Sequence, residues 1–176
     1  MAIGLAAVRV FAANERLNQI LIEHLEPKAW NAKPPGKVRT IAAMFTHVHN
    51  VRVKWVRLNV PHLKVPKQLS RTHCTQKQAR VALAESAKRC EELLAEALGG
   101  EGRIKKFRRD GWGQAWPVGV EMLCYMVAHE AHHRGQVLLL AHQMGWPLPK
   151  EVGYGIWNWE KVWKECGAKG GIGSVS

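Results

Sequence analysis

The chain has 176 residues, of which 47% are hydrophobic, and it carries 26 lysine and arginine residues against 14 aspartate and glutamate residues. This hydrophobic content excludes a disordered chain, and the length suits one folded domain with its own core. The formal net charge of +12 predicts attraction to anions, which include acidic small molecules, nucleic acids and membrane surfaces.

The cysteine and hydropathy patterns predict a cytoplasmic protein. The four cysteines, Cys74, Cys90, Cys124 and Cys166, form no C-x-x-C pair, and a disulfide framework is not expected in so long a chain with so few of them. The apolar run at the N-terminus has no charged segment before it and is interrupted by Arg9, so no signal peptide is expected. No apolar stretch reaches the about 18 residues of a membrane span, so we expect no membrane partner.

Four long helical segments are expected, and strand signals are weak. The first runs from about Leu5 to Leu25 and ends before Pro27, which cannot continue a helix. The second runs from about Val38 to Asn59, where apolar residues recur at alternating steps of three and four, as they do in an amphipathic helix. The stripe on the first helix consists of Ala13, Leu17, Ile20 and His24.

The third and fourth segments have clearer end signals. Thr75 and Gln78 form a capping-box pattern at the start of the third, and Gly99 follows its end. The fourth is expected to start at Pro117, because proline is favourable in the first turn of a helix, and to end before Gly145.

These elements predict an all-α fold, a four-helix bundle. The long connections before the third and fourth helices permit a crossover topology. We expect the bundle to occupy a single domain over residues 1–166, with a short C-terminal extension and a flexible tail at 167–176. Within the extension, Trp157, Trp159 and Trp163 are expected to pack over the bundle on a short helix.

The most informative segment is His129–Gln136, which reads His-Glu-Ala-His-His-Arg-Gly-Gln. On a helix, His129 and His133 lie four residues apart on one face, so that both imidazoles can reach one metal ion. They lie on the apolar stripe of the fourth helix, where a buried polar ring needs a partner. His132 is three residues from His129, so these two form an alternative pair, which fits the stripe less well.

A third ligand has to come from elsewhere, because a catalytic zinc site usually has three protein ligands. His142 lies on the same helix, about 13 Å farther along its axis than His133, which is too far. The glutamates of the C-terminal extension stay open as alternatives. On the second helix, His47 and His49 flank the apolar arc from opposite sides, and periodicity does not choose between them.

Two of these segments, Thr46–Trp55 and His129–Gln136, together with Trp146-Pro147, carry a resemblance to a known family. Over roughly residues 8–150 the chain resembles the DinB/YfiT-like superfamily of metal-binding four-helix bundles. The resemblance implies an up-down-down-up topology. It also implies a divalent metal, zinc or nickel, held by one histidine of the second helix and an H-x-x-x-H pair of the fourth. Carried onto this sequence, the metal ligands are His47, His129 and His133.

The resemblance also implies an enzyme. Relatives in the superfamily include transferases and isomerases that use a low-molecular-weight thiol as cosubstrate, and others are described as metal-dependent hydrolases. The segment also matches the H-E-x-x-H pattern of zinc peptidases. However, Glu130 points about 100° away from His129 around the helix, so we interpret it as a residue behind the ligands or on the surface. No catalytic residue is assigned. Glu130, Arg52 and Arg134 are candidates near the metal, and the two arginines are candidates for binding an anionic substrate.

Two other classes of function stay open. One is a non-enzymatic metal-binding or nucleic-acid-binding module that uses the basic loop 103–109, in which five basic residues surround Phe107. A charge and an aromatic ring together bind phosphates and stack on bases, although nucleic acid is not the expected partner. The other is a purely structural metal site, closed by a fourth protein ligand. The expected partners are a small anionic substrate and, because eight tryptophans leave apolar surface to spare, a second copy of the chain in a homodimer.

Overall fold

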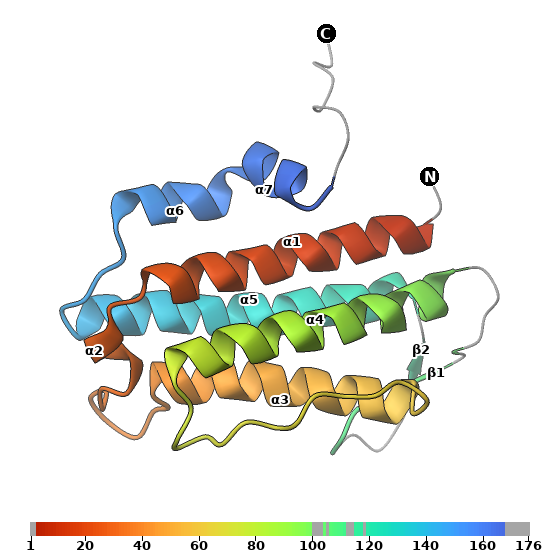
Figure 1. Cartoon of the computed structure of the whole chain (residues 1–176), viewed down its shortest axis with the longest axis horizontal. Helices are drawn as coiled ribbons and strands as arrows, with labels where there is room; N and C mark the ends of the chain where they lie inside the picture. Colours follow the sequence, from red (N-terminus) through yellow and green to blue (C-terminus); the bar gives the residue numbers. More distant parts are fainter. Residues whose placement is uncertain (1–2, 100–103, 105, 112–114, 118, 168–176) are drawn as a thin grey trace, which may run out of the picture.

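The computed structural model describes residues 3–99, 104, 106–111, 115–117 and 119–167 (Figure 1). These residues form seven helices and one short antiparallel strand pair, so the predicted all-α class is confirmed. The elements are α1 (Ile3–His24), α2 (Pro27–Trp30), α3 (Ile41–Asn59), α4 (Gln76–Leu98), β1 (Lys106–Phe107), β2 (Trp116–Pro117), α5 (Val120–Gln143), α6 (Lys150–Trp157) and α7 (Trp159–Glu165).

The four long helices pack side by side. Helix α4 contacts both α1 and α3, and α5 contacts the same two helices (Figure 1). The connection over residues 60–75 runs back along the bundle, so α3 and α4 begin at the same end. None of the described helices combines the length and the apolar character needed to cross a membrane. Because α3 and α5 are neighbours, side chains from both can meet in one site.

Capping side chains set two of the helix starts. The hydroxyl of Thr75 accepts from the backbone N–H of Gln78, and the side chain of Gln78 accepts from the backbone N–H of Thr75, so the predicted capping box is confirmed. Thr40 caps α3 in the same way by accepting from the N–H of Ala43 at 3.1 Å. Helix α3 therefore begins at Ile41, three residues later than the apolar pattern predicts.

The predicted start of the fourth long helix at Pro117 is wrong. Pro117 pairs with Lys106 in the β1–β2 ladder, and α5 begins at Val120. Gly119 stands between them with a φ of 138°, a conformation that a side chain would strain, so the chain turns there before the helix starts. Strands of two residues are too short to show a hydrophobic alternation in the sequence.

Two hydrophobic clusters fill the bundle, and buried polar residues lie between them along each helix. On α1, Asn14 and Asn18 lie between Phe11 of one cluster and Leu21 of the other. On α3 and α5, buried Arg52 and Glu130 occupy equivalent places. The middle of the bundle is therefore polar, although its two ends are apolar.

The two faces of α1 pack against different partners. The predicted stripe packs on the C-terminal extension, since Ala13, Leu17 and Ile20 contact Val152 of α6 and Val162 of α7. The face of α1 toward the bundle carries asparagines and a glutamate, so no apolar pattern in the sequence marks it as buried.

The three tryptophans of the extension were expected to pack over the bundle, and two of them do not. They lie on two short helices instead of one. Trp157 of α6 is 72% exposed and Trp159 at the start of α7 is 38% exposed, while Trp163 packs against the α1 face. Of the predicted flexible tail at 167–176, only Gly167 lies within the described residues.

Candidate metal centre

Three histidines from two helices converge near the middle of the bundle. His47 comes from α3, and His129 and His133 come from α5, and their candidate ligand nitrogens all lie within 4.8 Å of one another. The ring centroids are 5.4 Å apart for His47 and His129, 4.9 Å for His47 and His133, and 4.8 Å for His129 and His133. We call these three residues the histidine cluster.

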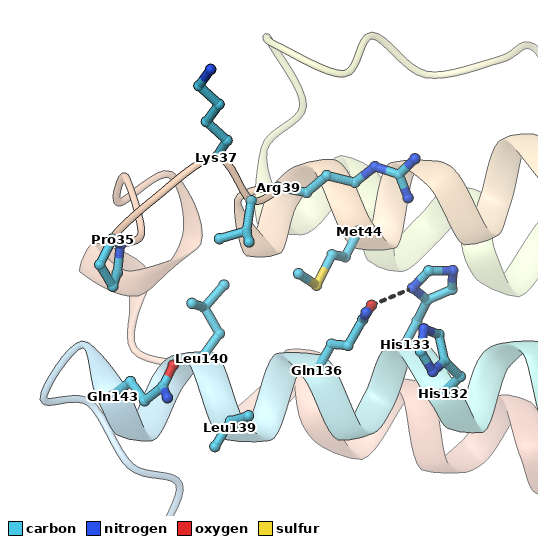
Figure 2. A pocket seen from close by; sticks show the side chains of 11 residues that line it. Pro35, Lys37, Arg39, Met44, His132, His133, Gln136, Leu139, Leu140 and Gln143 are labelled. Carbon is cyan, nitrogen blue, oxygen red and sulfur yellow. Dashed lines mark hydrogen bonds between the residues drawn. The ribbon is translucent and has the colours of Figure 1, made fainter.

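The hydrogen bonding of the histidine cluster fits a divalent metal. Nδ1 of His133 lies 2.8 Å from Oε1 of Gln136, which leaves Nε2 of that ring for another partner (Figure 2). Nδ1 of His129 is buried and has no hydrogen-bond partner in the described part of the chain. A buried polar atom without a partner lowers stability. A metal ion is a partner for such an atom, and imidazole donors suit both zinc and nickel.

The protonation state of the histidine cluster also suits metal binding. Burial first, and then repulsion between a proton on His47 and the neighbouring His133 and Arg39, lower the pKa of His47 to about 3. Burial likewise lowers the pKa of His129 to about 4 and holds the pKa of His133 below its ordinary value. All three rings are therefore neutral at pH 7, and a neutral imidazole is the form that binds a metal.

We expect the metal-free protein to lose stability as the pH falls from about 6.5 toward 4. In this range the unfolded chain takes up protons on His47 and His129 that the folded chain does not accept, so the free energy of unfolding decreases as the pH falls. The contribution of these two histidines to stability is complete above about pH 6.5. One such histidine contributes up to about 1.4 kcal/mol per pH unit. Urea unfolding with a chelator, across this range, should give a shallower slope for His47→Gln than for the wild type. Equal slopes would contradict a folded state that keeps His47 neutral.

The two histidines that compete with this set in the sequence lie elsewhere. His49 is fully buried, with Nδ1 3.1 Å from the hydroxyl of Ser86 and Nε2 3.0 Å from the carbonyl of Lys67. Both of its nitrogens already have protein partners. His132 is exposed and is not part of the cluster, although its ring lies 5.2 Å from that of His133. Of the two histidine pairs considered on α5, the structure therefore brings His129 and His133 together with His47.

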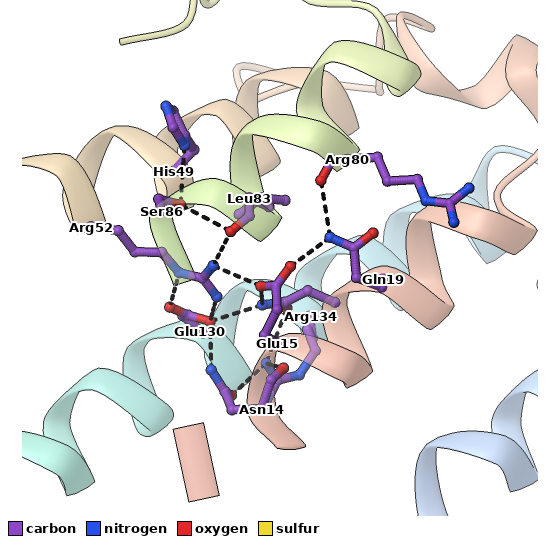
Figure 3. Close-up of polar contacts among 11 residues, drawn as sticks. Asn14, Glu15, Gln19, His49, Arg52, Arg80, Leu83, Ser86, Glu130 and Arg134 are labelled. Carbon is purple, nitrogen blue, oxygen red and sulfur yellow. Dashed lines mark hydrogen bonds and ion pairs between the residues drawn. The ribbon is translucent and has the colours of Figure 1, made fainter. Parts of the chain in front are cut away.

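Glu130 lies neither on the surface nor toward the cluster. Its carboxylate is fully buried and accepts from Nε of Arg52 at 2.7 Å and from Nη2 at 2.6 Å (Figure 3). It also accepts from the side-chain amides of Asn14 and Asn18 at 2.6 and 2.8 Å. Of the two predicted alternatives, a position behind the ligands or on the surface, burial excludes the surface. A carboxylate held this way is not available as the general base of a peptidase.

The guanidinium N–H groups of Arg52 and Arg134 donate to acceptors in the interior of the bundle. Nη1 of Arg52 donates to Glu15 at 2.6 Å, and Nη1 of Arg134 donates to the side-chain oxygens of Asn14 and Asn18 at 2.8 and 3.1 Å. Both arginines are buried. The expectation that they bind an anionic substrate is therefore wrong, because the acceptors that hold them come from the protein. We call the linked residues the buried ion network: Asn14, Glu15, Asn18, Arg52, Glu130 and Arg134.

The basic loop 103–109 does not present its aromatic ring to solvent. Phe107 is 1% exposed and packs in the cluster that also contains Trp55 and Met126. Arg103 and Lys105 lie outside the described residues. The guanidinium of Arg109 lies over the ring of Tyr125, 5.5 Å from its centroid. The predicted stacking of a base on Phe107 is therefore wrong, since the ring belongs to the core.

A pocket of about 440 Å³ opens beside the histidine cluster, between the segment before α3 and one face of α5. Its lining includes His133, Gln136 and Met44 together with two cations, Lys37 and Arg39 (Figure 2). Neither cation is singled out by the sequence, because both lie in a stretch rich in proline and glycine that reads as an ordinary exposed loop.

The family model described as the DinB family matches residues 4–158, a range that spans nearly all of α1 and continues through α6, and so includes the histidine cluster and the pocket. No curated protein matches the chain.

Proposed function

Since this chain belongs to the DinB family, we propose that it is a metal-dependent enzyme built on a four-helix bundle of up-down-down-up topology. In this proposal His47, His129 and His133 bind zinc or nickel, and the reaction uses a low-molecular-weight thiol. The observation that carries the proposal is the histidine cluster itself, in which the candidate nitrogens lie within 4.8 Å of one another and one buried nitrogen lacks a partner.

In this proposal, neighbouring side chains orient the histidines that bind the metal. The contact between Gln136 and Nδ1 of His133 fixes the orientation of that ring. The rings of Trp55 and Tyr125 pack against His129, with centroids 5.6 and 6.0 Å away, and restrict its rotation. His47 and His129 are only partly buried, which leaves an approach for a small molecule. A divalent metal bound there supplies a Lewis acid that lowers the pKa of a thiol or a water molecule beside it.

A thiol is favoured over a water as the nucleophile because a carboxylate base is missing at the site. Hydrolysis by an H-E-x-x-H site needs the glutamate to take a proton from water, and Glu130 is turned away and bound to Arg52. None of the described residues that line the pocket is acidic. A thiol is acidic enough to lose its proton once a metal lowers its pKa. Hydrolysis stays the second candidate reaction.

An open position for the substrate is supported by the donor count. Within the described residues the cluster contains three ligand side chains and no fourth, whereas a structural zinc site is usually closed by four. The single domain over 1–166, the homodimer and the cytoplasmic location stay predictions. The exposed side chains of Tyr154 and Trp157 on α6 support a homodimer, because they leave apolar surface uncovered.

Replacing the native metal with cobalt(II) tests this proposal directly. We expect the cobalt form to develop a new sulfur-to-metal absorption band in the near ultraviolet when 2-mercaptoethanol is added, because the thiolate takes the open position. Ethylene glycol, which differs by an oxygen in place of sulfur, is the matched control and should give no such band. The band should be absent in His129→Ala. A cobalt spectrum that does not respond to thiol would instead indicate a closed, structural site.

A further inference from the structure

The pocket beside the histidine cluster has the properties of a small-molecule site. Its volume of about 440 Å³ falls within the roughly 300–1,000 Å³ typical of such sites. His133 lies in its lining, so a molecule in the pocket lies next to the proposed metal centre. The inference below therefore rests on the proposed function and concerns the class of substrate.

The charge of the pocket is one-sided. Lys37 and Arg39 line it, and no acidic residue does so among the described residues. Arg39 makes no hydrogen bond or ion pair with any residue in the described part of the chain, so its guanidinium is available to a ligand. Figure 2 shows the side chain of Arg39 extending toward the side of His133, whereas Lys37 points outward.

The rest of the pocket is apolar. Met44 of α3 and Leu139 and Leu140 of α5 line it farther from the cluster (Figure 2). Leu139 is 59% exposed, which is an unfavourable place for a leucine unless another group covers it. A ligand in the pocket therefore meets a cation near the histidines and an apolar wall beyond them.

We propose that this pocket binds the substrate and that the substrate is an amphipathic carboxylate. The carboxylate pairs with Arg39, close to the end of the molecule that reacts at the histidine cluster, and a short apolar chain lies along Met44, Leu139 and Leu140. A guanidinium presents two parallel N–H donors that match a carboxylate. Among the described residues that line this pocket Arg39 is the one arginine, which favours a singly charged group over a phosphate.

Methionine methyl NMR on the full chain, with hexanoate as the probe, tests the inference with or without metal. Met44 lines the pocket, and its signal is assigned with Met44→Leu. Met122 is fully buried in the other cluster and serves as an internal control. Hexanoate should shift the Met44 signal and leave the Met122 signal in place, and hexan-1-ol should bind more weakly. Chloride salt keeps the ionic strength equal in all titrations.

The matched variants are Arg39→Gln and Arg57→Gln. Both remove one arginine charge, but Arg57 is an exposed residue near the far end of α3 and does not line the pocket. We expect Arg39→Gln to weaken hexanoate binding by about tenfold and Arg57→Gln to leave it unchanged.

Three results would overturn the inference: no shift of Met44, equal affinity in Arg39→Gln, or tighter binding of hexan-1-ol or hexyl phosphate than of hexanoate. Metal content measured on the same samples separates the two proposals. Absence of metal from the wild type contradicts the proposed function, while the hexanoate titration still decides the substrate class.

Discussion

Alanine at His47 or at His133 is expected to remove the bound metal. The wild-type chain, purified without an affinity tag and supplied with zinc or nickel, should hold about one ion per chain. Each variant deletes one of three converging nitrogens. Loss of an outer hydrogen bond to a ligand already costs about 10–100-fold in metal affinity, and loss of the ligand itself should cost more. Mass spectrometry of the metal content after gel filtration measures this directly.

His132→Ala is the matched control for this experiment. His132 lies on α5 beside His133 and is exposed, and it belongs to the alternative pair with His129 that the sequence leaves open. We expect this variant to retain its metal. Loss of metal in His132→Ala with retention in His133→Ala would move the centre to the other pair. A wild-type chain without metal, even with zinc or nickel added, would contradict the three-histidine centre and favour a non-enzymatic module.

The same experiment has a stability readout. A ligand that binds only the folded state at 100 times its dissociation constant stabilises it by about 2.7 kcal/mol. For a chain of this length that corresponds to a rise of about 5–11 °C in melting temperature. The rise should disappear on chelation, and it should be absent in His47→Ala at every metal concentration that saturates the wild type.

The sequence predicts the helices of this fold well because their signals are local. Steps of three and four residues mark the long helices, and the Thr75 cap marks one start. The pairing of His129 with His133 is local as well, since residues four apart share a helix face. The choice of His47 over His49 is different. Both histidines flank the same apolar arc. What distinguishes them is that α5 packs next to α3 on the side of His47, and periodicity carries no information about which helices are neighbours.

Long-range contacts explain what the sequence could not predict. Arg52 and Glu130 are 78 residues apart, and neither position alone shows that the other neutralises its charge. The inward face of α1 is polar because Asn14 and Asn18 donate hydrogen bonds to the carboxylate of Glu130, so the apolar stripe of this helix lies on its other face. Arg39 is near the cluster only because the chain bends before α3.

Breaking the buried ion network is expected to cost a large part of the stability of the protein. Burial alone would lower the pKa of Arg52, but the carboxylates of Glu130 and Glu15 raise it above its ordinary value. Burial alone would raise the pKa of Glu130, and Arg52 holds it below its ordinary value instead. Arg52→Met leaves these carboxylates buried without their main counter-charge. Removing one partner of such a pair costs about 3–5 kcal/mol, against a total of about 5–15 kcal/mol for a typical domain.

Urea unfolding of Arg52→Met, Glu130→Gln and the double variant measures this effect. The two residues are in direct contact, so the double variant should lose less than the sum of the single losses. Glu160→Gln is the matched control, because it removes an exposed partner of Lys164 at a spacing of four residues and should leave the midpoint unchanged. If Arg52→Met unfolds at the same urea concentration as the wild type, the buried ion network does not stabilise the fold.

The metal content of Glu130→Gln separates the role of this residue from that of its neighbour His129. The carboxylate of Glu130 is turned into the bundle, and its sequence neighbour His129 is not among its hydrogen-bond partners, which are Arg52, Asn14 and Asn18. We therefore expect Glu130→Gln to be less stable than the wild type and still to bind about one metal per chain. The opposite result, unchanged stability with loss of metal, would make Glu130 part of the metal site and restore the peptidase-like interpretation of the His129–His133 segment.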